Sequence, residues 1–106
     1  MSVAETDARL IERTGRGDRA AFEELYRRFA RPVLGMALRQ LGDNGRAEDA
    51  TQETFAAIWR SARSYRAERG SASAWLYTVA RHAIIDRARQ RTEAAAQVPD
   101  GASAEA

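Results

Sequence analysis

Residues 19–41 read RAAFEELYRRFARPVLGMALRQL, and their apolar positions recur every three or four residues. This spacing places one apolar stripe along a helix, because an α-helix advances about 100° per residue. Asp18 can cap the helix at its start, and Gly42 with the following Asp43-Asn44-Gly45 segment predicts a turn at its end. We therefore expect a helix from about Arg19 to Leu41, with a buried stripe formed by Phe22, Leu25, Tyr26, Phe29, Val33, Met36 and Ala37.

Helical patterns also occupy the sequence on both sides of this segment. Ala, Leu, Glu, Gln and Arg dominate, and no alternating run of β-branched residues indicates a strand. We expect further helices over residues 7–14, about 46–62, and from a Ser71 cap to about Arg91. The sequence thus predicts an all-α fold, a compact bundle of about four helices within residues 1–91. Residues 92–106 are rich in Ala, Gln, Pro, Gly and Ser and are expected to form a flexible tail.

Length and composition exclude several classes of protein. A chain of 106 residues is expected to form one domain. The absence of cysteine excludes a disulfide scaffold, a thiolate zinc site and a cysteine nucleophile. No apolar run approaches the roughly 18 residues of a membrane span, and no export signal is visible, so we expect a cytoplasmic protein without membrane insertion. His82 is the single histidine and lacks a matching nucleophile, so we expect no enzyme activity, metal or cofactor.

The positive charge is concentrated in one third of the sequence. The net charge is only +2, but residues 60–91 carry eight Arg against two acids. All 17 basic residues are Arg, which codon bias in a GC-rich genome would explain by itself. The guanidinium group nevertheless suits bidentate contacts with phosphates and base edges. This basic block indicates a surface for nucleic acid.

The third expected helix has an apolar face and a polar face. Ala47, Ala50, Thr51, Thr54, Phe55, Ile58 and Ala62 share the inner face at helical spacing. Asp49, Gln52, Glu53, Ala56 and Arg60 fall almost opposite. The polar side is either a solvated face or a docking surface for a basic partner helix.

The loop and the fourth expected helix combine arginines with aromatic residues. Tyr65 and Trp75 are interleaved with Arg63, Arg66, Arg69 and Arg81, a mixture that can hold phosphates and stack the bases of a single strand. Trp75 could equally be a core residue at the border of the inner face. The far side of the helix carries Thr78, Arg81, His82, Ile85 and Arg89, which are either a nucleic-acid contact or a solvated basic face.

Two motifs in these segments resemble bacterial sigma factors of the extracytoplasmic-function (ECF) group. The run AEDATQETFAAIW at residues 47–59 resembles region 2.2, and RGSASAWLYTVARHAIIDRAR at 69–89 is similar to regions 2.3 and 2.4. The second helix, with Phe22, Tyr26 and Pro32, is similar to region 2.1. The chain departs from the family pattern at His82, where many members have Asn. The resemblance covers about residues 7–91.

The resemblance implies a function without catalysis. Such a domain binds core RNA polymerase through the clamp helices of the β′ subunit, and recognises and helps melt the promoter −10 element by holding the non-template single strand. The polymerase-binding residues implied are Asp49, Gln52, Glu53, Phe55 and Arg60. The DNA-binding residues implied are Arg63, Tyr65, Arg66, Arg69, Ser73, Trp75, Thr78, Arg81, His82 and Arg89. An anti-sigma factor is an expected third partner, and association with the nucleoid is expected when the factor is active.

The resemblance also implies a missing part. Family members carry region 4, a helix-turn-helix domain, which this chain lacks, so residues 92–106 are expected to be an interdomain linker or a truncated tail. The alternative reading is a helical protein–protein adaptor that has a sigma-like fold and does not use DNA. The modest net charge favours that alternative.

Overall fold

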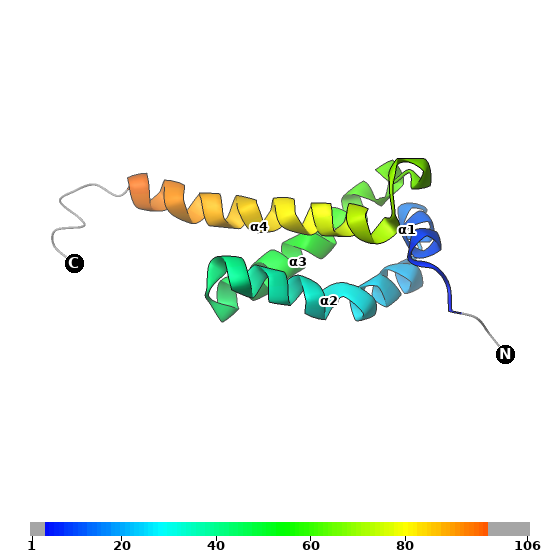
Figure 1. Cartoon of the computed structure of the whole chain (residues 1–106), viewed down its shortest axis with the longest axis horizontal. Coiled ribbons are helices and arrows are strands. Elements are labelled where there is room, and N and C mark those ends of the chain that lie inside the picture. Colours follow the sequence, from blue (N-terminus) through cyan, green and yellow to red (C-terminus); the bar gives the residue numbers. More distant parts are fainter. Residues whose placement is uncertain (1–3, 98–106) are drawn as a thin grey trace.

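The computed structural model describes residues 4–97 as a bundle of helices (Figure 1). These are α1 (Asp7–Gly15), α2 (Arg19–Leu41), α3 (Asn44–Ser61) and α4 (Ala72–Gln97), with short 3₁₀ turns η1 (Ala62–Ser64) and η2 (Ala67–Arg69) before α4. Helix α3 packs against both α2 and α4, and α1 closes one end of the bundle (Figure 1). The predicted all-α fold is confirmed. Among the helices of residues 4–97, none offers an apolar stretch of the length that a bilayer requires.

Side-chain caps set the starts of the two central helices. The Asp18 carboxylate accepts hydrogen bonds from the backbone N–H groups of Ala20 and Ala21, so α2 has the predicted bounds. The Asp43 carboxylate accepts from the N–H of Arg46 at 2.8 Å. Because Asp43 acts as a cap, α3 begins at Asn44, before the predicted start near Arg46. Gly42 ends α2 with φ 68°, a left-handed conformation that glycine adopts at little cost.

Helix α4 runs to Gln97, so the predicted end near Arg91 was wrong. Residues 92–97 read TEAAAQ, and Ala, Glu and Gln are strong helix formers, with no glycine or proline before Pro99. The hydroxyl of Thr92 donates to the carbonyl of Ala88 at 3.2 Å within this last part of the helix. Residues 98–106 of the predicted tail lie outside the described residues.

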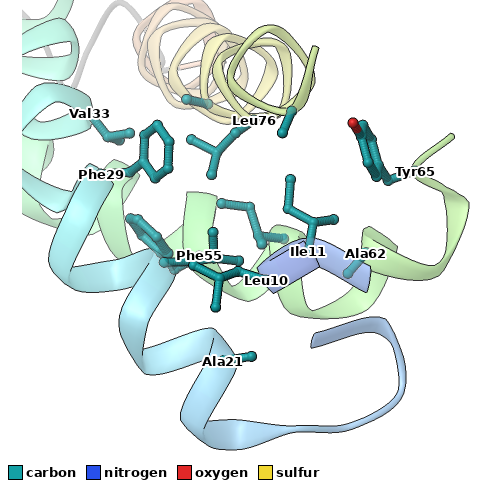
Figure 2. Close-up of a cluster of buried hydrophobic side chains, with 13 residues drawn as sticks. Leu10, Ile11, Ala21, Phe29, Val33, Phe55, Ala62, Tyr65 and Leu76 are labelled. Carbon is teal, nitrogen blue, oxygen red and sulfur yellow. The ribbon is translucent and has the colours of Figure 1, made fainter. Parts of the chain in front are cut away.

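The core is formed by one buried face from each helix and by Ala62 and Tyr65 of the segment between α3 and α4 (Figure 2). Its largest fully buried side chains include Ile11 of α1, Leu25 of α2, Ile58 of α3 and Leu76 of α4. A second cluster, farther along α2 and α4, contains Ala37, Leu41, Ala47, Ala50 and Ile84. The helical spacing therefore identified most of the core residues.

One core assignment was wrong, and one core residue was not predicted. Tyr26 was expected in the buried stripe of α2, but 47% of it is exposed, because it lies at the edge of the stripe beside Leu25. Ile84 was expected on neither face of α4, but it is 2% exposed because the far part of α2 covers it.

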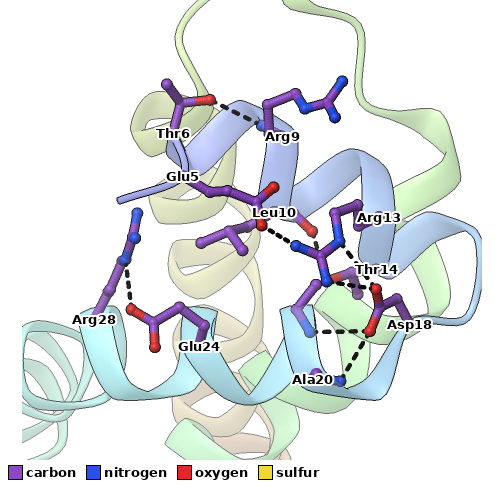
Figure 3. Close-up of polar contacts among 11 residues, drawn as sticks. Glu5, Thr6, Arg9, Leu10, Arg13, Thr14, Asp18, Ala20, Glu24 and Arg28 are labelled. Atoms are coloured by element: carbon purple, nitrogen blue, oxygen red, sulfur yellow. Dashed lines mark hydrogen bonds and ion pairs between the residues drawn. The ribbon is translucent and has the colours of Figure 1, made fainter. Parts of the chain in front are cut away.

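Helix α1 is attached by a close approach and by ion pairs (Figure 3). A Cβ atom at Gly15 would lie 3.1 Å from the backbone nitrogen of Arg63, so the glycine lets α1 pack directly on η1. The Arg13 guanidinium donates to the Asp18 carboxylate at 2.7 and 2.9 Å and pairs with Glu5. Arg28 of α2 pairs with Asp7 of α1 at 2.8 Å.

Hydrogen bonds from arginines lower the pKa values of two carboxyl groups in this part of the fold. The hydrogen bond from Arg13, together with the N–H of Ala21, lowers the pKa of Asp18. Hydrogen bonds from Arg28 and Arg27 lower the pKa of Glu24. Both carboxylates are therefore stabilised in their charged form, and this part of the fold favours neutral pH over acid pH.

Candidate functional site

Tyr65 holds the loop between α3 and α4 onto the core. Its ring is 6% exposed and packs edge-to-face on Trp75, with ring centroids 5.7 Å apart. Its hydroxyl donates to the carbonyl of Gly70 at 3.4 Å, which links the two 3₁₀ turns. Figure 2 shows the ring at the edge of the core cluster, beside the loop. The expectation that Tyr65 stacks on a base is therefore wrong for this conformation, because the protein already covers the ring.

A groove of about 450 Å³, the loop groove, opens between the loop and the first turns of α4. It is lined by Ser64, Tyr65, Arg66, Arg69, Gly70, Ser71, Ala74, Trp75 and Thr78, and no acidic residue is among them. Trp75 is half-buried, so it is both a core residue and part of the groove wall.

The arginines of the loop differ in how they are held. Arg66 donates to the backbone carbonyls of Arg63 and Tyr65, at 2.9 and 3.0 Å, and so lies against its own loop. Arg69 is exposed at the groove. Arg63 is exposed on the α1 side of the loop, near Glu12 and Arg16, and does not line the loop groove.

The outward side of α4 carries the other predicted DNA contacts. Thr78, Arg81, His82 and Arg89 are all exposed and recur at helical spacing, which brings them onto one strip. The hydroxyl of Thr78 donates to the carbonyl of Ala74 at 2.9 Å. Ser73 is half-buried, lies 3.5 Å from the hydroxyl of Ser71 and does not line the loop groove. The structure thus brings together the α4 strip and the loop groove, without Ser73.

The predicted polymerase-binding residues of α3 reach the surface, with one exception. The Asp49 side chain is 59% exposed and lies 4.0 Å from Arg87 of α4, a contact worth at most about 1 kcal/mol at a surface. Gln52 is exposed. Phe55, predicted as a polymerase-binding residue, is 3% exposed and packs edge-to-face on Phe22 and Tyr26. Phe55 therefore supports this face from beneath and offers no surface to a partner.

Gln52 lines a groove between α2 and α3 that the sequence did not predict. It is lined by Tyr26, Ala30, Arg31, Leu34, Glu48, Thr51 and Gln52. Tyr26 is half-exposed over Phe55, with ring centroids 4.9 Å apart, and gives the groove an aromatic wall. The position of Tyr26 at the edge of the apolar stripe, with a hydroxyl that favours water, is the sequence signal that could have identified it.

The two predicted surfaces meet in a groove between α3 and α4. Glu53 accepts a hydrogen bond from Arg60 at 3.1 Å, and both residues line this groove. The opposite wall comes from α4 and includes Trp75, Thr78 and His82, which belong to the predicted DNA contacts. Glu53 and Arg60 therefore lie where the predicted polymerase-binding surface meets the predicted DNA-binding surface. Gln52 lies on the side of α3 that faces α2.

The chain is similar in sequence to known ECF sigma factors. The chain is 40% identical over 80 residues to the ECF RNA polymerase sigma factor SigK of Mycobacterium tuberculosis (strain ATCC 25618 / H37Rv), covering 76% of this chain and 43% of that protein. SigK of Mycobacterium sp. (strain KMS) is 42% identical over 88 residues, covering 83% and 45%. The chain thus spans less than half the length of these relatives.

A solved structure matches the fold over nearly the whole chain. It is the NMR structure of an engineered region 2 of sigmaE in complex with GTAAAA, with a TM-score of 0.75 and 29% identity, covering 87% of this chain and 95% of that one. Residues 25–94, which contain both motifs, match the family described as Sigma-70 region 2. The resemblance drawn from those motifs is confirmed, and the chain belongs to the Sigma-70 region 2 family.

Proposed function

We propose that this chain is the part of an ECF sigma factor that binds core RNA polymerase and recognises and helps melt the promoter −10 element. The observation that carries the proposal is the loop groove, a concave surface with two arginines, a half-buried tryptophan and no acid. Phosphates favour the arginines, and an unstacked base favours the aromatic wall. The sigmaE region 2 structure, which has the same fold, was solved in complex with GTAAAA.

The energetics of strand opening are compatible with such a groove. Unstacking a base costs a few kcal/mol, and stacking on an aromatic side chain returns about 1–3 kcal/mol per base. Trp75 is the aromatic residue available for this, because the ring of Tyr65 is buried. In the proposal, Trp75 and Thr78 contact the captured base, while Arg69, Arg81 and Arg89 hold the flanking phosphates of the non-template strand.

Polymerase docking is assigned to the α2–α3 side of the molecule. Gln52 offers amide hydrogen bonds, Glu48 offers a carboxylate, and the Tyr26 ring offers apolar area within one groove. These groups suit a basic partner helix, and the proposed partner is the clamp-helix coiled coil of the β′ subunit. An anti-sigma factor would act by covering this groove or the loop groove, and a promoter-binding factor of this kind would work in the cytoplasm at the nucleoid.

The test begins with selection from a randomised single-stranded DNA library. The proposal expects a defined motif to be enriched and expects binding of the selected strand to fall steeply with salt. Arg81→Ala should weaken that binding and lower its salt slope by about 0.7, because the guanidinium holds a phosphate, while binding to core polymerase stays unchanged. Gln52→Ala should weaken polymerase binding and leave the DNA affinity unchanged. An adaptor that does not use DNA would enrich no motif and show no salt dependence, which would refute the proposal.

A further inference from the structure

A shallow groove between α2 and α4 carries positive charge from Arg39, which lines no groove of the proposed function, and from Arg31, which also lines the α2–α3 groove. It is lined by Arg31, Pro32, Gly35, Met36, Arg39 and Tyr77, and we refer to it as the α2–α4 groove. None of these residues is acidic. Within residues 4–94, whose side chains the structure describes, neither Arg31 nor Arg39 forms an ion pair. The two guanidinium groups therefore lack a counter-charge in the described part of the chain.

Gly35 lies in the middle of α2 and lines this groove. Glycine destabilises a helix interior relative to alanine, so its presence there calls for a reason. A Cβ atom at Gly35 would meet only the Arg39 Nη1 atom, at 3.7 Å, which is an ordinary contact distance. Gly15 is different, because its close approach to the backbone of Arg63 explains it. Packing within the described chain does not require glycine at position 35, whereas a ligand approaching from outside would.

The geometry of the two arginines suits a repeating anion. They are eight residues apart on α2, which corresponds to about 12 Å along the helix axis. One strand of duplex DNA carries a phosphate about every 3.4 Å of its axis, so this span matches three or four phosphates. Arg81 is exposed one helical turn after Tyr77 and continues the positive charge onto the α4 strip. A protein partner would need a deep apolar pocket for an anchoring side chain, and this groove is open and shallow.

We propose that the α2–α4 groove binds the sugar-phosphate backbone of duplex DNA, with Arg31 and Arg39 contacting phosphates and Gly35 allowing close approach. The inference rests on the proposed function, because it gives a DNA-binding domain a second contact. It adds a sequence-independent contact on the side of α4 that faces α2, separate from the loop groove. It predicts that duplex and single-stranded DNA are bound by different residues.

The test measures binding of a fluorescent 20-base-pair duplex of random sequence by anisotropy at several salt concentrations. The double variant Arg31→Ala/Arg39→Ala should bind about tenfold more weakly at low salt. Its log–log salt slope should be smaller by about 1.8, since each phosphate contact contributes about 0.9. The matched control, Arg9→Ala/Arg19→Ala, loses the same two charges from exposed sites outside the groove and should bind within about twofold of the unmodified chain.

A second variant separates the groove from general electrostatic attraction. Gly35→Leu keeps every charge but adds a bulky side chain to the groove, and it should lower duplex affinity about fivefold or more. Its helical circular dichroism and unfolding midpoint should be no lower than those of the unmodified chain, because leucine favours a helix. The inference is overturned if Gly35→Leu binds normally, or if both double variants lose affinity equally. It is also overturned if polyglutamate displaces the labelled duplex at a lower concentration of negative charge than unlabelled duplex does, and if Gly35→Leu abolishes this displacement by polyglutamate.

The same variants distinguish this inference from the proposed function. Selection of a single-stranded motif and its dependence on Arg81 report the loop groove and the α4 strip, and Gly35→Leu should leave both unchanged. If the motif is selected normally while the α2–α4 variants have no effect, only the further inference fails. If no motif is selected, the proposed function fails, whatever the duplex measurements show.

Discussion

Replacing Tyr65 with alanine should destabilise the whole domain rather than merely remove a stacking partner for a base. The ring is 6% exposed, packs against Trp75 at 5.7 Å between centroids and closes the core beneath the loop. Arg66 donates to the Tyr65 carbonyl, so the loop arginines depend on the position of this residue. The loop groove would therefore lose its shape when the ring is removed.

The magnitude follows from burial. Truncation of a large buried aromatic side chain to alanine costs about 3–5 kcal/mol, including the cavity that is left. About 0.5–1.5 kcal/mol of this is the edge-to-face contact with Trp75. Tyr65→Phe removes only the hydroxyl, whose 3.4 Å bond to Gly70 is long, and should cost less than about 1 kcal/mol. Tyr65→Leu keeps apolar volume in the core without an aromatic ring and should cost about 1–2 kcal/mol.

The assay combines urea unfolding, followed by circular dichroism, with binding of the selected single-stranded oligonucleotide. With a slope of about 1.5 kcal/mol per molar urea, Tyr65→Ala should lower the midpoint by about 2–3 M. The Phe and Leu variants should both bind the oligonucleotide within about twofold of the unmodified chain. The reasoning is refuted if Tyr65→Leu is as stable as the unmodified chain yet binds DNA 5- to 150-fold more weakly. That result would be the loss of about 1–3 kcal/mol of stacking by an exposed ring.

Three further outcomes follow from the packing and charges. The pKa values of Asp18 and Glu24 are lower in the folded chain than in the unfolded chain, so the stabilisation by these two carboxylates is present above their unfolded pKa values and is lost as pH falls below about 4.5. The thermal unfolding midpoint should therefore drop below that pH, and it should drop less for Asp18→Asn. Gly15→Ala should destabilise by about 1–3 kcal/mol through its contact with η1, whereas Gly35→Ala should stabilise by up to about 1 kcal/mol; equal urea midpoints would contradict this contrast. Leu76→Ala, at a fully buried site, should cost about 2–5 kcal/mol in the same assay, and a cost below 1 kcal/mol would show that the core is not packed as described.

Local signals were sufficient where one residue decides a boundary. Asp18 predicted the start of α2, and Gly42 its end, because a cap or a left-handed turn depends on a few neighbouring atoms. The end of α4 was misjudged because a change in composition was given more weight than the helix propensity of residues 92–97.

Residue roles at the surface were harder to predict, since they depend on what other helices cover. In the sequence, Tyr65 and Trp75 have the same pattern, because both are aromatic residues with arginines nearby. Only the folded chain buries the first beneath the loop and leaves the second half-exposed at the groove. Phe55 was assigned to a docking surface although it shares the inner face of α3 by spacing, and the structure places it in the core.

The order and type of the helices, their caps and most buried positions are determined by the sequence alone, because periodicity and capping act over a few residues of one chain segment. The grooves between helices are decided by the tertiary structure, because each of them needs two segments that are distant in the sequence, whereas the loop groove is lined by residues 64–78 alone. Glu53 and His82 lie 29 residues apart in the sequence and yet line one groove, since α3 and α4 pack side by side. No local sequence pattern indicates that these two residues are close in space. They come together because the apolar faces of the helices are buried against each other.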